Sequence, residues 1–177
     1  MTRQQLEHVL RAAAGITGAD EIFVVGSQAI LGQYPDAPAE CRVSMEADLF
    51  TRRSPEDSLL IDGSIGEGSP FHQTFGYHAH GVGPETALFP EGWLDRVVAV
   101  RSPATKGATG LCPEVHDLAV SKLVAGRDKD TEYVSALLRH GLANVSTIEE
   151  RLTRTTVEPA VRAAAFGRLR RLAAARP

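Results

Sequence analysis

Two short groups of residues near the N-terminus have the types and spacing to handle a phosphorylated substrate. Gly26 and Ser27 follow the apolar run Glu21–Val25, and Glu46 and Asp48 come later, separated by one residue. Alternate side chains of a strand share a face, so the two carboxylates of such a strand would point to the same side. Paired oxygen ligands beside a glycine-containing turn are typical of Mg²⁺ and a chain of phosphates. The spacing therefore predicts a metal site next to a phosphate site.

The residues around these groups predict the elements that position them. Glu21–Val25 is a short β-branched run, typical of a buried strand, and Gln28–Leu31 predicts a short helix after the turn. Arg42–Phe50 alternates apolar and polar residues, which predicts a second strand with Val43 and Met45 on its packed face. A half-exposed strand with solvated charges explains the same alternation, and periodicity alone favours it.

The rest of the chain predicts a mixed αβ front half and an all-helical back half. Thr2, Pro113, Asp128 and a capping box of Ser146 with Glu149 mark helix starts. We expect residues 1–112 to form an αβ core and residues 113–177 a helical region packed on it as a single compact unit. The expected elements are helices over 2–14, 54–61, 113–126, 128–141, 146–154 and 157–175, strands over 71–87 (with a turn at 81–84) and 93–101, and a glycine-rich break at 63–69.

Length and composition exclude several classes of protein. The 177 residues, 43% of them hydrophobic, suffice for one domain with a real core. A net charge of −3 and the lack of a DNA-binding motif argue against general nucleic-acid binding, although a local patch could still hold RNA. Cys41 and Cys112 show neither zinc nor disulfide spacing, and no apolar run reaches transmembrane length. We expect a soluble cytoplasmic protein with no membrane partner.

Further polar residues are open to two interpretations. Lys122, Arg127, Lys129 and Asp130 lie at the junction of two predicted helices, where a solvated, salt-bridged surface is the favoured interpretation from the residues alone. His78 and His80 share a strand face and could ligate a metal, but packing or hydrogen bonding is favoured because no third ligand is near in sequence. Trp93 is expected in the core. The basic residues of the last helix could contact RNA or a protein partner, although a solvated face is favoured: Arg162, Arg168, Arg170 and Arg171.

Taken together, the order strand, Gly-Ser, helix, loop and strand with acid-x-acid resembles the minimal nucleotidyltransferases. Within them the chain resembles a bacterial branch related to the abortive-infection and toxin–antitoxin nucleotidyltransferases. The matching pieces are VVGSQAI, RVSMEADLF, GYHAHGVGPETALFPEGWLDRVVAV and HDLAVSKLVAGRDKDTEYVSALL. In the last piece the branch pattern D-L-x-x-x-K-L-x-A-x-R-x-K-D is filled by Asp117, Leu118, Lys122, Leu123, Ala125, Arg127, Lys129 and Asp130.

The resemblance implies a fold, a reaction and a set of site residues. It implies an α+β fold with a mixed sheet flanked by helices, and transfer of a nucleotidyl group from an NTP with Mg²⁺ or Mn²⁺ as cofactor. The acceptor would be an RNA, a protein or a small molecule, and a toxin-like member would have an antitoxin partner. The implied metal ligands are Glu46 and Asp48, and these two also belong to the implied catalytic residues together with Lys122 and Asp130. The implied phosphate contacts are Gly26, Ser27, Gln28, Lys122 and Arg127.

The sequence departs from the family pattern at two positions. Glu46 stands where the superfamily usually has Asp, which shifts the ligand by about one methylene. The third carboxylate, expected on the strand Arg96–Arg101, is missing, and Asp95 is a poor substitute by position. These departures keep a second function open, a catalytically weak or inactive nucleotide-binding module. A plain scaffold that binds no nucleotide is the third.

Overall fold

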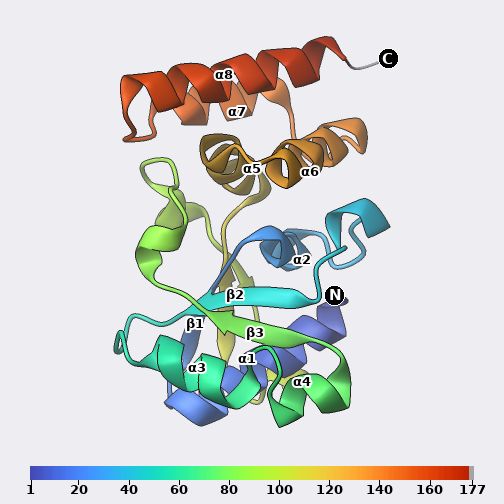
Figure 1. Cartoon of the computed structure of the whole chain (residues 1–177), viewed down its shortest axis with the longest axis vertical. Helices are drawn as coiled ribbons and strands as arrows, with labels where there is room; N and C mark the ends of the chain where they lie inside the picture. Colours follow the sequence, from blue (N-terminus) through green and yellow to red (C-terminus); the bar gives the residue numbers. More distant parts are fainter. Residues whose placement is uncertain (176–177) are drawn as a thin grey trace.

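The computed structural model describes residues 1–175 and is built on one mixed five-stranded sheet with helices below and above it (Figure 1). The strand order is β3-β2-β1-β5-β4. Strand β1 runs antiparallel to β2 and parallel to β5, while β3 is parallel to β2 and β4 antiparallel to β5. The expected α+β class is confirmed. The strands are β1 (Glu21–Val25), β2 (Glu46–Phe50), β3 (His78–Gly81), β4 (Val98–Val100) and β5 (Thr109–Cys112).

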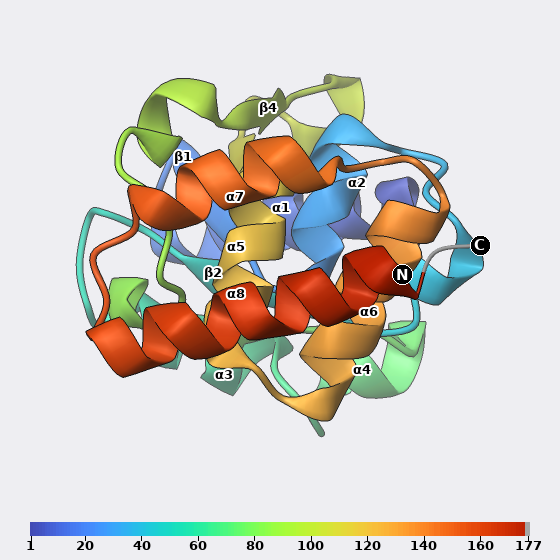
Figure 2. The same ribbon diagram turned by 90° about the horizontal axis from the view of Figure 1, so that it is seen from above.

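The helices form two groups. Helices α1 and α3 pack on each other below the sheet, and α5 to α8 gather above it (Figure 1). Seen from above, α7 and α8 lie across α5 and contact each other (Figure 2). None of the helices in residues 1–175 is long and apolar enough to span a membrane. The helices are α1 (Arg3–Thr17), α2 (Ile30–Gln33), α3 (Asp57–Ile65), α4 (Pro70–Phe75), α5 (Val115–Ala125), α6 (Asp128–Arg139), α7 (Val145–Thr153) and α8 (Pro159–Ala174).

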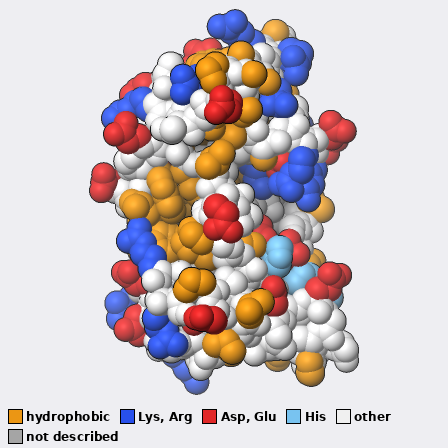
Figure 3. Space-filling view, turned by 60° about the vertical axis from the view of Figure 1, so that its left-hand side comes forward, with side chains coloured by type: hydrophobic (Ala, Val, Ile, Leu, Met, Phe, Trp, Pro, Cys, Tyr) orange, Lys and Arg blue, Asp and Glu red, His pale blue; other side chains and the backbone are white. Residues whose placement is uncertain are grey.

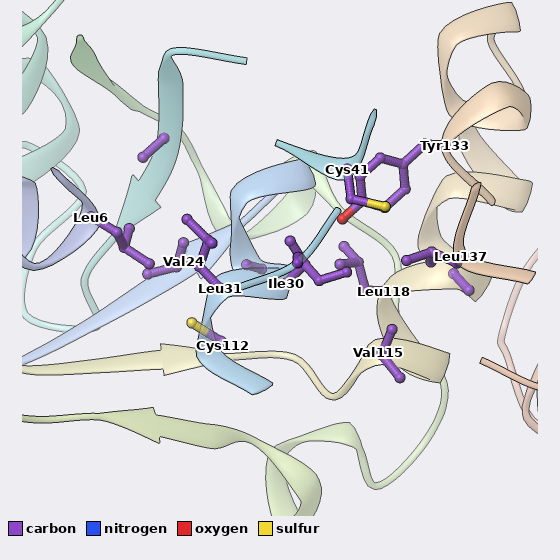
Figure 4. Close-up of a cluster of buried hydrophobic side chains, with 14 of the residues drawn as sticks. Leu6, Val24, Ile30, Leu31, Cys41, Cys112, Val115, Leu118, Tyr133 and Leu137 are labelled. Atoms are coloured by element: carbon purple, nitrogen blue, oxygen red, sulfur yellow. The ribbon is translucent and has the colours of Figure 1, made fainter. Parts of the chain in front are cut away.

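The main core runs without a break from α1 through the sheet to the upper helices. Leu6, Val24, Ile30, Leu118 and Leu137 follow one another along it, and all are buried (Figure 4). This continuity arises because α2 packs between the sheet and α5. The division into residues 1–112 and 113–177 stays a prediction, and its last two residues lie outside the described part of the chain.

A smaller apolar cluster covers part of the opposite face of the sheet. Phe23 and Phe50 stack with their ring centroids 4.7 Å apart, and Trp93 meets Phe23 edge-on at 5.8 Å. Trp93, expected in the core, is half-buried at the border of this cluster. Glu46 and Asp48 share this face with Phe50, because alternate residues of β2 point the same way.

Strand β2 begins later than its alternation predicts. The N-terminal amine of Met1 donates hydrogen bonds to the carbonyls of Arg42 and Ser44, at 2.7 and 2.8 Å. These two carbonyls therefore accept hydrogen bonds from the N-terminal amine, and not from a neighbouring strand. Val43, predicted to be packed, is 78% exposed, and Met45 is 39% exposed. The prediction of a strand from Arg42 is wrong for its first four residues.

Two further predicted strands are partly helical. Within 71–87, Ser69 caps the helix α4 by accepting a hydrogen bond from the His72 N–H, with Pro70 in the first turn, so only His78–Gly81 is strand. Within 93–101, a short 3-10 helix (Trp93–Arg96) precedes β4. In the first stretch a local helix-start signal outweighs the β-type composition, whereas the 3-10 helix of the second stretch has no side-chain cap.

Smaller differences concern helix ends. Helix α3 runs through Gly63 to Ile65, so the predicted break is shorter. Helix α7 is capped by Asn144, whose side chain accepts from the Thr147 N–H, and the predicted box of Ser146 with Glu149 is wrong. Asp128 is the first residue of α6 and its cap position is held by Arg127. Thr2 caps α1 as predicted.

Candidate active site

The Gly-Ser turn and the two carboxylates meet at the end of strand β1. Gly26 adopts φ +71°, and a Cβ at this position would lie 2.1 Å from Oδ2 of Asp48. Only glycine fits, because both the left-handed conformation and the close carboxylate exclude a side chain. Ser27 then opens a 3-10 helix (Ser27–Ala29) whose backbone leads into α2. The turn is therefore held directly against Asp48.

Strand β3 places two histidines beside the two carboxylates. The parallel register pairs Glu46 with His78 and Asp48 with His80. His78 Nε2 lies 3.3 Å from Oε2 of Glu46, and His80 Nδ1 lies 3.1 Å from Oδ1 of Asp48. One donor atom from each of Glu46, Asp48 and His80 falls within 4.8 Å of the others, close enough to hold a metal ion. The favoured interpretation of both histidines as packing or hydrogen-bonding residues thus holds for His78 but is incomplete for His80.

The electrostatics of this group favour a cation. Burial raises the pKa of Asp48, and the neighbouring charge of Glu46 raises it further. The hydrogen bond and charge of His80, and the charge of Lys122, offset this only in part. Two carboxylates that repel each other in a partly buried place are stabilised by a positive ion between them. The donor set therefore suits a divalent metal.

A second group of charges comes from the junction of α5 and α6. Asp130, almost fully buried, accepts two hydrogen bonds from Arg127, at 2.6 and 3.2 Å, and pairs with Lys122 Nζ at 3.3 Å. Burial raises the pKa of Asp130, but the Arg127 hydrogen bond and the charges of Lys122 and Arg127 outweigh this and lower it. The carboxylate thus stays ionised and holds both cations in place.

One cavity of about 950 Å³ connects the two groups. On the molecular surface, basic side chains stand above histidine and acidic side chains on one face, and an apolar hollow lies beside them (Figure 3). The predicted site residues that line the cavity are Gly26, Ser27, Glu46, Asp48, Lys122, Arg127 and Asp130. Gln28 is the exception, since its side chain is buried and it does not line the cavity.

Tyr133 links the two halves of the site and is missed by sequence reasoning. Its buried hydroxyl donates to the carbonyl of Ser27 at 2.7 Å, and Lys122 Nζ lies 5.8 Å from its ring. In the sequence it belongs to the apolar stripe of α6, and no local signal distinguishes it from a core aromatic. For His80 a signal exists: the triplet His78-Ala79-His80 has the same alternation as Glu46-Ala47-Asp48.

The expected position of a third carboxylate is wrong. Strands β1 and β5 separate β4 from β2, so a residue of 96–101 would lie about 14 Å away at the usual strand spacing. The neighbour of β2 is β3, and its residue opposite Asp48 is His80. The third position of the cluster is thus filled by an imidazole.

The basic residues of α8 include two with structural roles. Arg168 donates to the carbonyl of Leu123 at the end of α5, and its guanidinium occupies the space where a Cβ of Gly126 would be. Arg162 donates to the carbonyl of Thr155. Through these hydrogen bonds the two arginines connect α8 to the end of α5 and to the segment that precedes α8.

The comparison with protein families identifies a family for most of the chain. A family model described as "Nucleotidyltransferase of unknown function (DUF6036)" matches residues 4–166. Because the match covers most of the chain, the chain belongs to this family. The comparisons with curated proteins and with solved structures give no match. Membership of the superfamily is thus confirmed, whereas the abortive-infection and toxin–antitoxin branch stays a prediction.

Proposed function

We propose that this member of the family is a metal-dependent enzyme that moves a nucleotidyl group from an NTP to a hydroxyl group of an RNA, a protein or a small molecule. One observation carries the proposal. The Gly-Ser turn, the Glu46–Asp48 pair and the Lys122–Arg127–Asp130 group come from distant parts of the sequence, yet line the same cavity. Hydrogen-bond donors for phosphate, carboxylate ligands for a metal, and cationic side chains together suit a nucleoside triphosphate.

The residues fit a divalent ion. Glu46 and Asp48 offer carboxylate oxygens on one strand face, and Gly26 leaves room for the Asp48 carboxylate. Glu46 and Asp48 would hold Mg²⁺ or Mn²⁺, which would supply the positive charge that offsets the negative charge developing on the leaving group. Because the fit rests on the donor set of this chain, it supports a metal independently of the family.

The remaining polar groups would bind and orient the triphosphate. Ser27 and the backbone N–H groups of the turn would contact the terminal phosphates, as other nests of N–H groups do. Lys122 would contribute a point charge and Arg127 a forked pair of donors. Asp130 would act through these two cations, which it holds toward the cavity.

The transfer itself would be a single in-line displacement. The acceptor oxygen forms a bond to the α-phosphorus, the bond from that phosphorus to the bridging oxygen breaks, pyrophosphate leaves, and the hydroxyl proton passes to water. In-line attack requires the acceptor to arrive opposite the pyrophosphate. A second hollow of about 720 Å³ lies on the same face of the sheet, beside Phe50 of β2, and is lined by Phe23, Val82 and Trp93. We assign this hollow to the acceptor.

A label-transfer experiment tests the proposal. The protein is incubated with each of the four α-labelled NTPs, Mg²⁺ or Mn²⁺, and total tRNA or cell protein. We expect label in an acceptor with at least one NTP and its loss in the double variant Glu46→Ala/Asp48→Ala. The double variant Asp36→Ala/Glu150→Ala, which removes two exposed carboxylates outside the cavity, is the matched control. Absence of transfer with every NTP and both metals would reject an enzyme that modifies RNA or protein.

The second candidate is a nucleotide-binding module of low or no activity. The observation that favours it is the imidazole of His80 at the third position of the cluster, where many relatives in the superfamily use a carboxylate. Calorimetry separates the two candidates. Tight, metal-dependent NTP binding without turnover supports the module, and absence of nucleotide binding leaves only a scaffold.

A toxin-like role is a narrower form of the first candidate. It requires an acceptor essential to the cell and an antitoxin partner that restrains the enzyme. We expect growth arrest on expression of the wild-type chain and normal growth with Glu46→Ala/Asp48→Ala. Normal growth with both chains contradicts the toxin-like role, while label transfer in vitro would still support the enzyme.

A further inference from the structure

We propose that His80 is the third ligand of the metal site, and that the site therefore prefers a first-row transition ion such as Mn²⁺ to Mg²⁺. The inference rests on the proposed function for the use of the ion, but the binding itself is measurable without turnover. Glu46, Asp48 and His80 each present a donor atom to the others within 4.8 Å. Donors that share one ion at about 2.1 Å lie at most about 4.2 Å apart, so a small inward movement completes the site.

The register of β2 and β3 distinguishes the two histidines. His78, opposite Glu46, is turned inward, with its side chain 10% exposed and its Nε2 on the Glu46 carboxylate. It orients Glu46, as second-layer partners of metal ligands do. His80, opposite Asp48, is 51% exposed and lines the cavity. Its position gives the imidazole access to an ion that Glu46 and Asp48 also reach.

The surroundings of the three donors are built for a cation in this place. The Asp48 carboxylate is pressed against Gly26, where a Cβ would come within 2.1 Å of Oδ2. Glu46 and Asp48 repel each other, and the cations of the α5–α6 junction that act on Asp48, Lys122 and Arg127, are themselves paired with Asp130. Glycine at position 26 thus leaves room for the Asp48 carboxylate, and β2 holds the two like charges on one face, an arrangement that a divalent ion between them would stabilise.

The chemistry of the third ligand sets the metal preference. Carboxylate and water oxygens suit Mg²⁺, whereas an imidazole nitrogen favours first-row transition ions. We therefore expect a site of two carboxylates and one imidazole to bind Mn²⁺ in preference to Mg²⁺ more strongly than a site of three carboxylates does. Replacing His80 by Asp should reverse the shift.

Pulsed electron paramagnetic resonance of bound Mn²⁺ tests the ligand directly, because a coordinated imidazole imposes a ¹⁴N modulation on the Mn²⁺ signal. We expect this modulation in the wild-type chain and its loss in His80→Gln and His80→Asp. His140→Gln, which removes the exposed histidine that follows α6 and does not line the cavity, is the matched control and should keep the modulation. Competition gives the preference: we expect the Mg²⁺ concentration that displaces half of the Mn²⁺ to fall about tenfold in His80→Asp.

Each result decides the inference. Mn²⁺ bound without nitrogen modulation, modulation that survives in both His80 variants, or absence of Mn²⁺ binding overturns it. Because His80 is half exposed, both variants should fold, and circular dichroism checks this; if His80→Asp misfolds, His80→Gln carries the test. Label transfer by a wild-type chain that lacks the nitrogen modulation would reject the role of His80 and leave the proposed function intact.

Discussion

Asp117 and Asp130 belong to the same helix pair, and their surroundings differ in one respect that separates structure from function. Both are almost fully buried, at 0% and 1% exposure, and both pair with two cations. Around Asp117 the cations are enclosed: Arg96 and Arg151 are 28% and 17% exposed. Around Asp130 both cations line the cavity, with Lys122 12% and Arg127 59% exposed. The orientation of the cations, and not the acid itself, distinguishes the two.

The closed cluster (Arg96, Glu114, Asp117 and Arg151) ties three elements together. Arg96, from the 3-10 helix before β4, donates two hydrogen bonds of 2.9 Å to Asp117 at the start of α5. Arg151 of α7 pairs with Asp117 at 3.1 Å and also with Glu114. The open cluster (Lys122, Arg127 and Asp130) joins only α5 and α6. We therefore expect the closed cluster to govern stability and the open cluster to govern nucleotide binding.

The largest expected effect breaks the closed cluster. Arg151→Ala should lower the free energy of unfolding by about 3 kcal/mol, because it takes a partner from the buried Asp117 and from the partly buried Glu114. Arg127→Ala, the matched change in the open cluster, should cost less, about 1–2 kcal/mol, because it affects a single carboxylate, Asp130 keeps Lys122 at 3.3 Å, and the Arg127 side chain is mostly in water. Urea unfolding followed by circular dichroism measures both. Equal losses would show that the two clusters do not differ in this way.

The second-largest expected effect is a loss of folding stability at low pH through Glu114 of the closed cluster. Burial raises the pKa of Glu114, but the hydrogen bond and charge of His116 and the charge of Arg151 outweigh it, and the pKa falls from 4.5 to about 2. A depressed pKa contributes stability above the unfolded value that is lost as pH falls through the folded value. We expect about 2–3 kcal/mol to disappear between about pH 5 and pH 2, and Glu114→Gln to remove this part of the pH dependence.

Asp48 in the candidate site should behave with the opposite sign. Its pKa is raised, by burial first and by Glu46 second, so its ionisation destabilises the metal-free fold as pH rises above 3.8. Asp48→Asn should therefore unfold at an equal or higher urea concentration than the wild-type chain at neutral pH. A clear loss of stability in Asp48→Asn would contradict the electrostatic account of the site.

A smaller effect concerns nucleotide affinity. Arg127→Ala should raise the dissociation constant of an NTP about tenfold, the loss expected for one charge-assisted contact. Arg154→Ala, which removes an exposed arginine of the α7 end outside the cavity, should leave it unchanged. Calorimetry with a non-hydrolysable NTP analogue measures both constants. An unchanged affinity in Arg127→Ala would remove the open cluster from the phosphate site.

The smallest expected effect tests how α6 supports the Gly-Ser turn. Tyr133→Phe deletes the hydrogen bond to the Ser27 carbonyl and should cost about 1 kcal/mol or less, with a severalfold rise in the KM for NTP. Tyr34→Phe is the matched control, since its hydroxyl donates to the Leu142 carbonyl at 3.1 Å away from the cavity. Similar KM values in the two variants would make Tyr133 an ordinary core residue.

Much of the fold and of the candidate site follows from local patterns. The strand Glu21–Val25, the helices around Leu118 and Leu137, and the grouping of Glu46 with Asp48 rest on periodicity over neighbouring residues, and the structure agrees with them. The pattern fails where a distant group competes. Met1 engages the carbonyls of Arg42 and Ser44, and no local pattern contains that contact.

The sequence by itself indicated the superfamily and the α+β class through a resemblance carried by four pieces taken together, and the same resemblance singled out the two groups of residues that line the cavity. Only the tertiary structure decided the strand order, and with it that His80, and no residue of 96–101, stands beside Asp48. It also decided that Asp117 is enclosed while Asp130 supports an open site. The physical reason is the same in each case: which side chains become neighbours across the sheet and between helices is set by packing over the whole chain.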